Sequence, residues 1–292
     1  MTTLKLIEII NLTKEFDNFT ALDRLTMDVN AGELTIVFGA GGSGKSTLIS
    51  LLTGIQTASS GTINYPAENK PSFGVVFQHS VLNDELTVWQ NLKSRADLFP
   101  DIQQQEIPDL MNKVGVSQYA DKKYGDLSHV IQRKVDIARA LINQPDLLFL
   151  DDPMTDLDTN SIQEIWNLLK ALQSSDNLTI FMTSQCFDEA ESADNIIILS
   201  EGVIIEQGSG ESLKEKYGQN YLWLSPNDEK SIVKKIKSKK IKKDSFKGVG
   251  IPINDFQEAI DTLNTYKNDI TNFMFHPITF KDIYYNIVKR DN

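Results

Sequence analysis

The spacing of hydrophobic and polar positions changes several times along this chain, and each change predicts a different element. Residues 1–30 alternate apolar and polar side chains in short runs, which predicts antiparallel strands joined by turns at 17–18 and 30–32. Residues 34–38 form a β-branched and aromatic run typical of a buried strand. A cluster of glycines follows, and residues 45–53 then have helical spacing up to Gly54, which predicts a helix.

From residue 72 onward, short apolar runs alternate with longer amphipathic segments. Residues 84–146 are mainly helical by this pattern, and further helices are expected at 161–172 and 187–192. Strands are predicted at 72–78, 147–151, 178–183, 196–199 and 203–205, the last two as a hairpin through Glu201-Gly202. Strands that alternate with helices in this way predict an α/β fold with a largely parallel sheet.

The composition changes near residue 218, which divides the chain into a predicted domain at 1–218 and a small C-terminal α/β domain at 219–292. Within the smaller domain, strands are expected at 221–224 and 270–275, and helices at 254–266 and 280–288.

Charge, cysteine and histidine content exclude several classes of protein. The formal net charge is −11, so the surface as a whole does not suit a nucleic acid. The single cysteine, Cys186, excludes an intramolecular disulfide framework, and three scattered histidines argue against a histidine-rich metal site. The sequence contains no run of 18 apolar residues and no signal-peptide core, so no membrane span is expected.

The glycine cluster carries the strongest chemical signal. Residues 39–47 read GAGGSGKST and fit the pattern G-x-x-x-x-G-K-[ST] between a predicted strand and a predicted helix. The glycines allow a tight loop whose backbone N–H groups point at a β-phosphate, and the helix N-terminus adds partial positive charge. Lys45 is expected to reach the β- and γ-phosphates, and the Ser46 hydroxyl to bind Mg²⁺.

A carboxylate for the same metal is expected behind this loop. The apolar run 147–150 ends in Asp151, and a phosphate-binding loop needs an acidic residue at a strand end to hold the water shell of magnesium. A lone aspartate could simply cap the following turn, but the order of strand and loop favours the metal.

These motifs occur in the order of an ABC-type ATPase, and about residues 4–215 resemble the nucleotide-binding subunit of an ABC transporter. By this resemblance Gln78 is the Q-loop glutamine, residues 127–141 contain the signature, 155–158 are the D-loop and 181–185 contain the switch position. The resemblance implies a P-loop NTPase core with a mostly parallel sheet, an antiparallel β subdomain and a helical subdomain at about 84–146.

Cofactors, partners and site residues follow from the same resemblance. Two such domains pair head to tail around ATP and Mg²⁺, and a separate transmembrane permease subunit places this chain at the cytoplasmic face of the membrane. Magnesium would be bound by Ser46, Gln78 and Asp151, with catalytic roles for Asp152 and Gln185. The nucleotide would be bound by Phe16 (stacking on adenine), Gly39, Ala40, Gly41, Gly42, Ser43, Gly44, Lys45, Ser46, Thr47, Gln78, Ser128 and Asp158.

Three motifs depart from the family pattern, and all three departures concern the γ-phosphate. The signature LSGGQ is replaced by LSHVI at 127–131, so His129 and Val130 put side chains where glycines let the backbone approach the partner's nucleotide. Asp152 replaces the glutamate that polarises water and is one methylene shorter. Gln185 replaces the switch histidine and cannot carry positive charge. Because the binding residues are intact, we expect a subunit that binds Mg·ATP and hydrolyses it slowly.

The sequence leaves two questions of assembly and role open. A heterodimer with a more active ATPase is favoured over a homodimer, since a homodimer would carry all three departures in every site. A transport subunit is favoured over a regulatory ABC protein that senses ATP, because the C-terminal extension resembles that of ABC-2-type drug or peptide exporters. Export is therefore expected, whereas the cargo is not predicted.

Residues 228–247 contain nine lysines and three acidic residues. Isoleucines and a valine are interspersed among the lysines. This spacing favours a helix with a buried apolar stripe and a solvated basic face. An electrostatic contact with anionic lipid or an acidic partner is the alternative.

Overall fold

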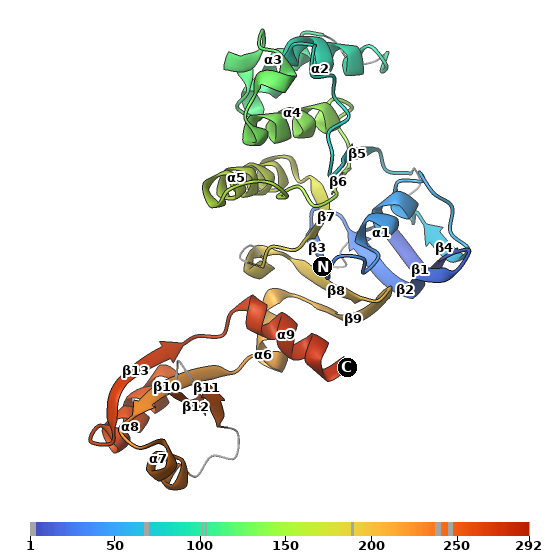
Figure 1. The fold of residues 1–292 in the computed structure, drawn as a ribbon. Coiled ribbons are helices and arrows are strands. Elements are labelled where there is room, and N and C mark those ends of the chain that lie inside the picture. Colours follow the sequence, from blue (N-terminus) through green and yellow to red (C-terminus); the bar gives the residue numbers. More distant parts are fainter. Residues whose placement is uncertain are drawn as a thin grey trace. The chain divides into compact units, whose positions relative to one another are not determined.

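The computed structural model describes residues 4–66, 70–100, 102, 104–187, 190–236, 241–244 and 248–291. The chain forms two compact units, Met1–Gly210 and Glu211–Asn292, so the division falls after residue 210 rather than after residue 218. Figure 1 labels the elements of both units. Within the described ranges, no helix is both long enough and apolar enough to cross a bilayer.

A six-stranded sheet forms the centre of the first unit, and its strands are β3 (Leu34–Phe38), β5 (Phe73–Val76), β6 (Leu147–Leu150), β7 (Thr179–Ser184), β8 (Asn195–Ser200) and β9 (Val203–Gly208). Their order is β5-β6-β7-β3-β8-β9, and all neighbours are parallel except the predicted hairpin β8–β9. Every residue of β3, β6 and β7 is buried, which explains the apolar run of β6 and the mostly apolar sequences of β3 and β7. The predicted α/β fold is confirmed.

An antiparallel sheet of order β2-β1-β4 accounts for the N-terminal alternation, with β1 at Lys5–Phe16, β2 at Phe19–Asn30 and β4 at Ser60–Asn64. Apolar side chains of β1 and β2 share one core with helix α1 (Lys45–Leu52). The sequence pattern did not predict β4, because four of its five residues are exposed and its hydrogen bonds to β1 alone define it as a strand.

The remaining helices of the first unit are α2 (Val88–Ala96), α3 (Glu106–Lys113), α4 (His129–Leu141) and α5 (Thr159–Asp176). Helices α2, α3 and α4 lie inside the segment predicted to be helical. Of the short helix expected at 187–192, the described residues form one 3-10 turn at Ala190–Ser192, while Phe187 lies outside it and stacks on Phe38 with ring centroids 5.7 Å apart. Residues 188–189 lie outside the described residues.

The second unit has an antiparallel sheet of order β11-β12-β10-β13, formed by β10 (Asn220–Pro226), β11 (Lys242–Asp244), β12 (Gly248–Ile253) and β13 (Ile270–His276). Its helices are α6 (Gly210–Tyr217), α7 (Glu229–Lys235), α8 (Phe256–Tyr266) and α9 (Phe280–Asp291). Side chains of β10, β12, α7 and α8 form a small apolar core that includes Leu222, Leu224, Ile232 and Ala259.

The lysine-rich segment is not one helix. Helix α7 ends at Lys235, residues 242–244 form strand β11, and residues 237–240 and 245–247 lie outside the described residues. Strand β12 was not predicted either, because two glycines and Pro252 indicate a turn rather than a strand between two neighbours. Pairing with β10 and β11 outweighs these local preferences.

Candidate nucleotide-binding site

The phosphate-binding loop lies between β3 and α1, as the motif predicts. Gly44 has a φ of 104° and precedes the first residue of α1, where no described side chain caps the helix. A Cβ at Gly44 would lie 2.6 Å from a methyl carbon of Leu22 and 2.7 Å from the carbonyl oxygen of Ala21. Glycine is therefore required at residue 44 by conformation and by space, and the first N–H groups of α1 are available to an anion.

Lys45 is folded back onto this loop. Its Nζ donates to the carbonyl oxygens of Gly39 at 2.8 Å and Ala40 at 3.0 Å, and the side chain is 8% exposed. Burial lowers the pKa of Lys45, while the charges of Asp152 and Asp151 oppose this shift. A phosphate that entered the loop would act in the same direction as these carboxylates and favour the ammonium form.

A short chain of hydrogen bonds joins the loop to the ends of β6 and β7. Ser46 Oγ donates to Asp151 Oδ1 at 3.1 Å, and Thr183 Oγ1 donates to the same oxygen at 2.8 Å. The backbone N–H of Asp152 donates to Thr183 Oγ1 at 2.8 Å. Thr183 therefore fixes the orientation of Asp151, a role that sequence reasoning missed although the threonine belongs to the switch strand.

The carboxylate and the amide expected at the γ-phosphate bind each other. Gln185 Nε2 donates to Asp152 Oδ2 at 2.9 Å. Asp152 is 7% exposed and has a φ of 45°, so its backbone holds a conformation that is uncommon for a residue with a Cβ. Asp152 and Gln185, which both depart from the family pattern, therefore form one hydrogen-bonded pair.

The residues present fit Mg·ATP. The hydroxyl of Ser46 and the carboxylate of Asp151 are within hydrogen-bonding distance, so one hard divalent cation can take oxygen ligands from both. A Cβ added at Gly41 or Gly42 would meet no atom within 4 Å, so the outer side of the loop is open to an incoming phosphate chain. No group of three or more acidic, histidine or cysteine side chains suited to a metal occurs among the described residues.

Gln78 is not joined to Ser46 or Asp151 by any hydrogen bond between described residues. It lines a separate cavity of about 180 Å³ together with His129 and Asp156. Arg133 of α4 holds the Q-loop there, because its two Nη atoms donate to the carbonyl oxygens of Phe77 at 2.9 Å and Gln78 at 3.0 Å.

A buried carboxylate supports Arg133. Asp136 is 3% exposed, lies 3.8 Å from Arg133 Nη1, and accepts hydrogen bonds from Ser80 at 2.6 Å and Tyr124 at 3.3 Å. Burial raises the pKa of Asp136, against the hydrogen bond from Ser80 and the charge of Arg133. Sequence reasoning missed this network, since no motif marks it and its members come from three separate segments.

The signature region begins α4, with Ser128 as the N-cap and His129 as the first helical residue. Both are exposed, and neither Ser128 nor another described side chain caps this helix. His129 Nδ1 lies 3.5 Å from the carbonyl oxygen of Asp156 in the D-loop. His129 therefore contacts the D-loop from the first turn of α4.

Two predicted nucleotide-binding residues outside the phosphate-binding loop, Phe16 and Asp158, have local partners. Phe16, 38% exposed, stacks on Phe19 with ring centroids 5.3 Å apart, and Lys14 Nζ lies 4.9 Å from the centre of its ring. Asp158 caps α5 by accepting from the N–H of Ser161 at 2.9 Å, and this backbone hydrogen bond lowers the pKa of Asp158.

Comparisons with known proteins agree with this geometry. The family model described as "ABC transporter" matches residues 22–155. The chain is 30% identical over 232 residues to the sulfate/thiosulfate import ATP-binding protein CysA of Pseudomonas syringae pv. tomato, covering 74% of this chain and 71% of the relative. It is 32% identical over 219 residues to the spermidine/putrescine import ATP-binding protein PotA of Mycoplasma capricolum, covering 71% of this chain and 62% of the relative.

Solved structures give the same fold. CbiO1 from Clostridium perfringens, part of the ABC transporter complex cbiONQ, has a TM-score of 0.66 and 27% identity, with 73% of this chain and 92% of that chain covered. The dimeric bacterial ABC transporter cassette MJ0796 has a TM-score of 0.62 and 24% identity, with 70% of this chain and 98% of that chain covered. The chain therefore belongs to the ABC transporter family, as an ATP-binding subunit whose cofactors are ATP and Mg²⁺.

Proposed function

We propose that this subunit binds Mg·ATP firmly and hydrolyses it slowly. The observation that carries the proposal is the 2.9 Å hydrogen bond between Gln185 and Asp152. The Asp152 carboxylate and the Gln185 amide, which would act at the γ-phosphate, are hydrogen-bonded to each other. The side chain of Asp152 is also one methylene shorter than that of a glutamate. A general base must come within about 2.6–3.2 Å of the atom whose proton it takes, so a retracted carboxylate forfeits much of its usual ~10²–10⁴-fold contribution.

The remaining residues serve binding. When bound, Mg·ATP supplies a γ-phosphoryl group whose charge the site must balance. Lys45 would exchange the carbonyl oxygens of Gly39 and Ala40 for phosphate oxygens, replacing neutral hydrogen bonds with stronger charge-assisted ones. Thr183 would keep Asp151 oriented toward the metal, while Asp152 would have to leave Gln185 before accepting a proton.

Restoring the family residues tests the proposal. The double variant Asp152→Glu/Gln185→His, assayed in the assembled transporter, is expected to raise kcat at least ~10-fold, because the longer carboxylate reaches the water and the imidazole reaches the phosphate. Affinity for ATP is expected to stay within about twofold. Gln207→His, an exposed glutamine in β9, is the matched control. A kcat no higher than that of the wild type would contradict slow hydrolysis caused by this pair.

We also propose that the subunit pairs with a second, more active cassette. The support is the position of His129 and Val130 at the start of α4, where a partner's nucleotide would meet their side chains. Affinity purification of the tagged chain from its native membranes, followed by mass spectrometry, is expected to recover a second cassette and a separate membrane permease. Recovery of the permease with this chain alone would establish a homodimer.

The direction of transport is a separate proposal. Export rests on the likeness of residues 219–292 to exporter subunits, whereas CysA and PotA are import proteins by name and therefore do not support it. None of the relatives named above is a non-transporting sensor, so the regulatory alternative lacks support as well. Uptake and efflux assays with inverted and right-side-out vesicles that contain the purified complex would separate export from import.

A contact between residues 228–247 and anionic lipid is the last part of the proposal. Lys235 and Lys243 form ion pairs with Asp269 and Glu229, so the contact would depend on other lysines of the segment. Sedimentation with phosphatidylserine liposomes tests it: Lys230→Glu/Lys234→Glu is expected to reduce a salt-sensitive association. Equal sedimentation of both proteins would leave only a solvated basic face.

A further inference from the structure

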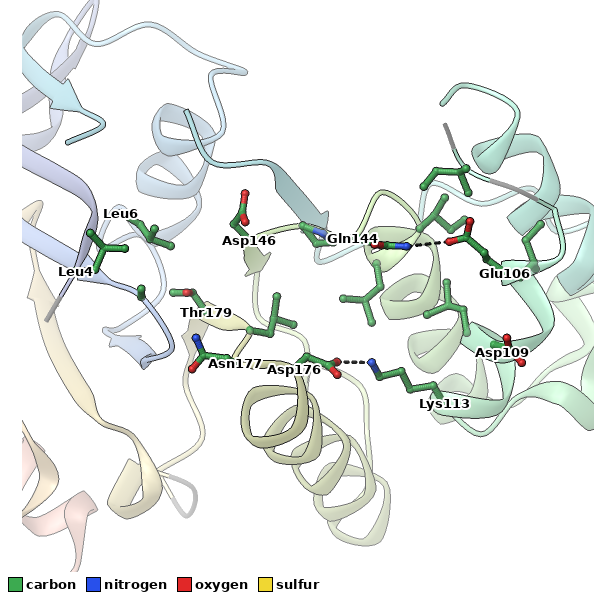
Figure 2. Close-up of a pocket in the computed structure, with 18 residues that line it drawn as sticks. Leu4, Leu6, Glu106, Asp109, Lys113, Gln144, Asp146, Asp176, Asn177 and Thr179 are labelled. Atoms are coloured by element: carbon green, nitrogen blue, oxygen red, sulfur yellow. Dashed lines mark hydrogen bonds and ion pairs between the residues drawn. The ribbon is translucent and has the colours of Figure 1, made fainter. Parts of the chain in front are cut away.

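A second cavity of the first unit lies at the opposite edge of the central sheet from the nucleotide residues. It has a volume of about 730 Å³ and lies where α3 faces the C-terminal end of α5 and the first residues of β1 (Figure 2). Asp146 and Thr179 line it at the points where β6 and β7 begin. Asp151 and Gln185, by contrast, follow the carboxyl ends of the same two strands. This cleft is therefore separate from the phosphate-binding loop.

The cleft combines an apolar floor with an acidic rim. Ile107, Ile142 and Leu178 line it and are each no more than 5% exposed. Among the described lining residues are four carboxylates and one lysine: Glu106, Asp109, Asp146, Asp176 and Lys113. A volume between ~300 and 1,000 Å³ is typical of sites for small organic molecules.

Among the described residues, some of the charged side chains on the rim have hydrogen-bond or ion-pair partners within the cleft, and others do not. Lys113 reaches across from α3 to form an ion pair with Asp176, and Gln144 donates to Glu106 at 2.8 Å, as Figure 2 shows. Asp109 is exposed and lies one turn before Lys113 on the same face of α3. Asp176 is the last residue of α5, where the unpaired carbonyl groups of a helix C-terminus add partial negative charge. The single lysine does not balance this field.

We propose that the cleft binds a small organic cation with an apolar body. Its ammonium group would be held by the exposed carboxylate of Asp109, beside the ion pair of Lys113 and Asp176, and its hydrocarbon part would cover the floor around Ile107 and Leu178. A neutral or anionic molecule of the same shape would meet the same floor but not the same charges. The chemistry of the rim therefore selects the sign of the ligand.

Two rigid helices connect the cleft with the surfaces expected to face a partner. Helix α4 runs from the signature at Ser128 to Leu141 in the cleft, about 20 Å, and α5 runs from the D-loop cap Asp158 to Asp176, about 27 Å. A ligand that bridges α3 and α5 fixes the C-terminal ends of these helices. As part of this proposal, the cleft and the nucleotide site are linked through these helices, so a ligand at one changes the affinity at the other by the same factor.

Calorimetric titration of the full chain with three matched probes tests the proposal. The probes are 4-phenylbutylammonium, the neutral 4-phenylbutan-1-ol and the anionic 4-phenylbutanoate. The ammonium is expected to bind about tenfold more tightly than the alcohol, and the carboxylate more weakly than either. Equal affinity for the ammonium and the alcohol would overturn the proposal.

Removing one rim charge locates the site. Asp109→Asn is expected to weaken binding of 4-phenylbutylammonium about fivefold. Asp121→Asn, which removes another exposed carboxylate of the helical subdomain outside the cleft, is the matched control and should leave it unchanged. Equal weakening by both substitutions would mean general surface attraction and would refute a defined site. Saturating 4-phenylbutylammonium should also change the affinity for ATP, and ATP should change that for the ammonium by the same factor.

Discussion

The two halves of the nucleotide site differ in what their polar groups already contact. In the binding half, Lys45 contacts loop carbonyl groups and Ser46 contacts Asp151, and both contacts can be exchanged for phosphate or metal. In the half of the site proposed for hydrolysis, the carboxylate of Asp152 already accepts a hydrogen bond from the amide of Gln185. The replacements for the usual glutamate and histidine thus fit each other rather than leaving a gap. The proposed combination of firm binding and slow hydrolysis therefore rests on contacts within one loop cluster.

Removing the lysine of the binding half should give the largest effect. Lys45→Ala is expected to weaken ATP binding about 10³-fold, since two charge-assisted hydrogen bonds to phosphate are worth ~2 kcal/mol each. Titration with a fluorescent ATP analogue measures it, and Lys267→Ala in the second unit is the control. If Lys45→Ala bound ATP within tenfold of the wild type, the division of the site into two halves would fail.

The support of the Q-loop should come next. Arg133→Met removes the hydrogen bonds to Phe77 and Gln78 and leaves Asp136 buried without its cation. It should lower the free energy of unfolding by about 3 kcal/mol in urea denaturation. Lys134→Met, which breaks only a surface pair with Glu164, should cost less than about 1 kcal/mol. Similar losses for both variants would show that the buried network does not hold the Q-loop.

The signature side should respond less strongly. His129→Gly/Val130→Gly restores the close backbone approach and is expected to raise the ATPase rate of the assembled transporter about fivefold, as one additional hydrogen bond to phosphate would. The Asp152→Glu/Gln185→His variant should exceed this gain. A larger gain from the glycines would place the main obstacle on the partner-facing side rather than on Asp152 and Gln185.

The aromatic pair at the β1–β2 turn should contribute a smaller share of ATP affinity. Phe16→Ala is expected to weaken ATP binding about threefold to tenfold, because a stacking contact is worth ~0.5–1.5 kcal/mol. Phe19→Ala is the control. It removes the contact between the two rings but leaves Phe16 in place to stack on adenine, since Phe19 contacts Phe16 and is 63% exposed. Comparison of ATP with GTP and inorganic triphosphate, the last lacking a base, identifies the contribution of stacking. If Phe16→Ala kept the wild-type preference among ATP, GTP and triphosphate, Phe16 would not contact the base.

The buried carboxylate of α4 should give a pH signature. Because burial raises the pKa of Asp136 above the ordinary value of an aspartate, the folded chain keeps a proton that the unfolded chain has lost at pH values between the two pKa values. Wild-type stability should therefore fall as pH rises through this window. The stability of Asp136→Asn relative to the wild type should increase over the same range, measured by urea unfolding at stepped pH. A constant difference would contradict the raised pKa.

Sequence reasoning succeeded where the information is contiguous. The phosphate-binding loop combines glycines, Lys45 and Ser46 in one segment. A fully apolar strand such as Leu147–Leu150 indicates by itself that both of its faces are buried. It failed where structure depends on distant partners. Strand β12 forms despite Pro252 because β10 and β11 pair with it. The hydrogen bonds of Arg133 to the Q-loop, and the bond between Asp152 and Gln185, join residues more than thirty positions apart and carry no local pattern.

The contrast between firm binding and slow hydrolysis is tested most directly on one sample of the purified transporter complex. ATP occupancy is measured by equilibrium dialysis, and phosphate release by a coupled assay at the same ATP and Mg²⁺ concentrations. We expect near-full occupancy of the site formed by this chain's Lys45, with a turnover at least ~10-fold slower than in the Asp152→Glu/Gln185→His complex. Full occupancy with the same brisk turnover in both complexes would contradict it.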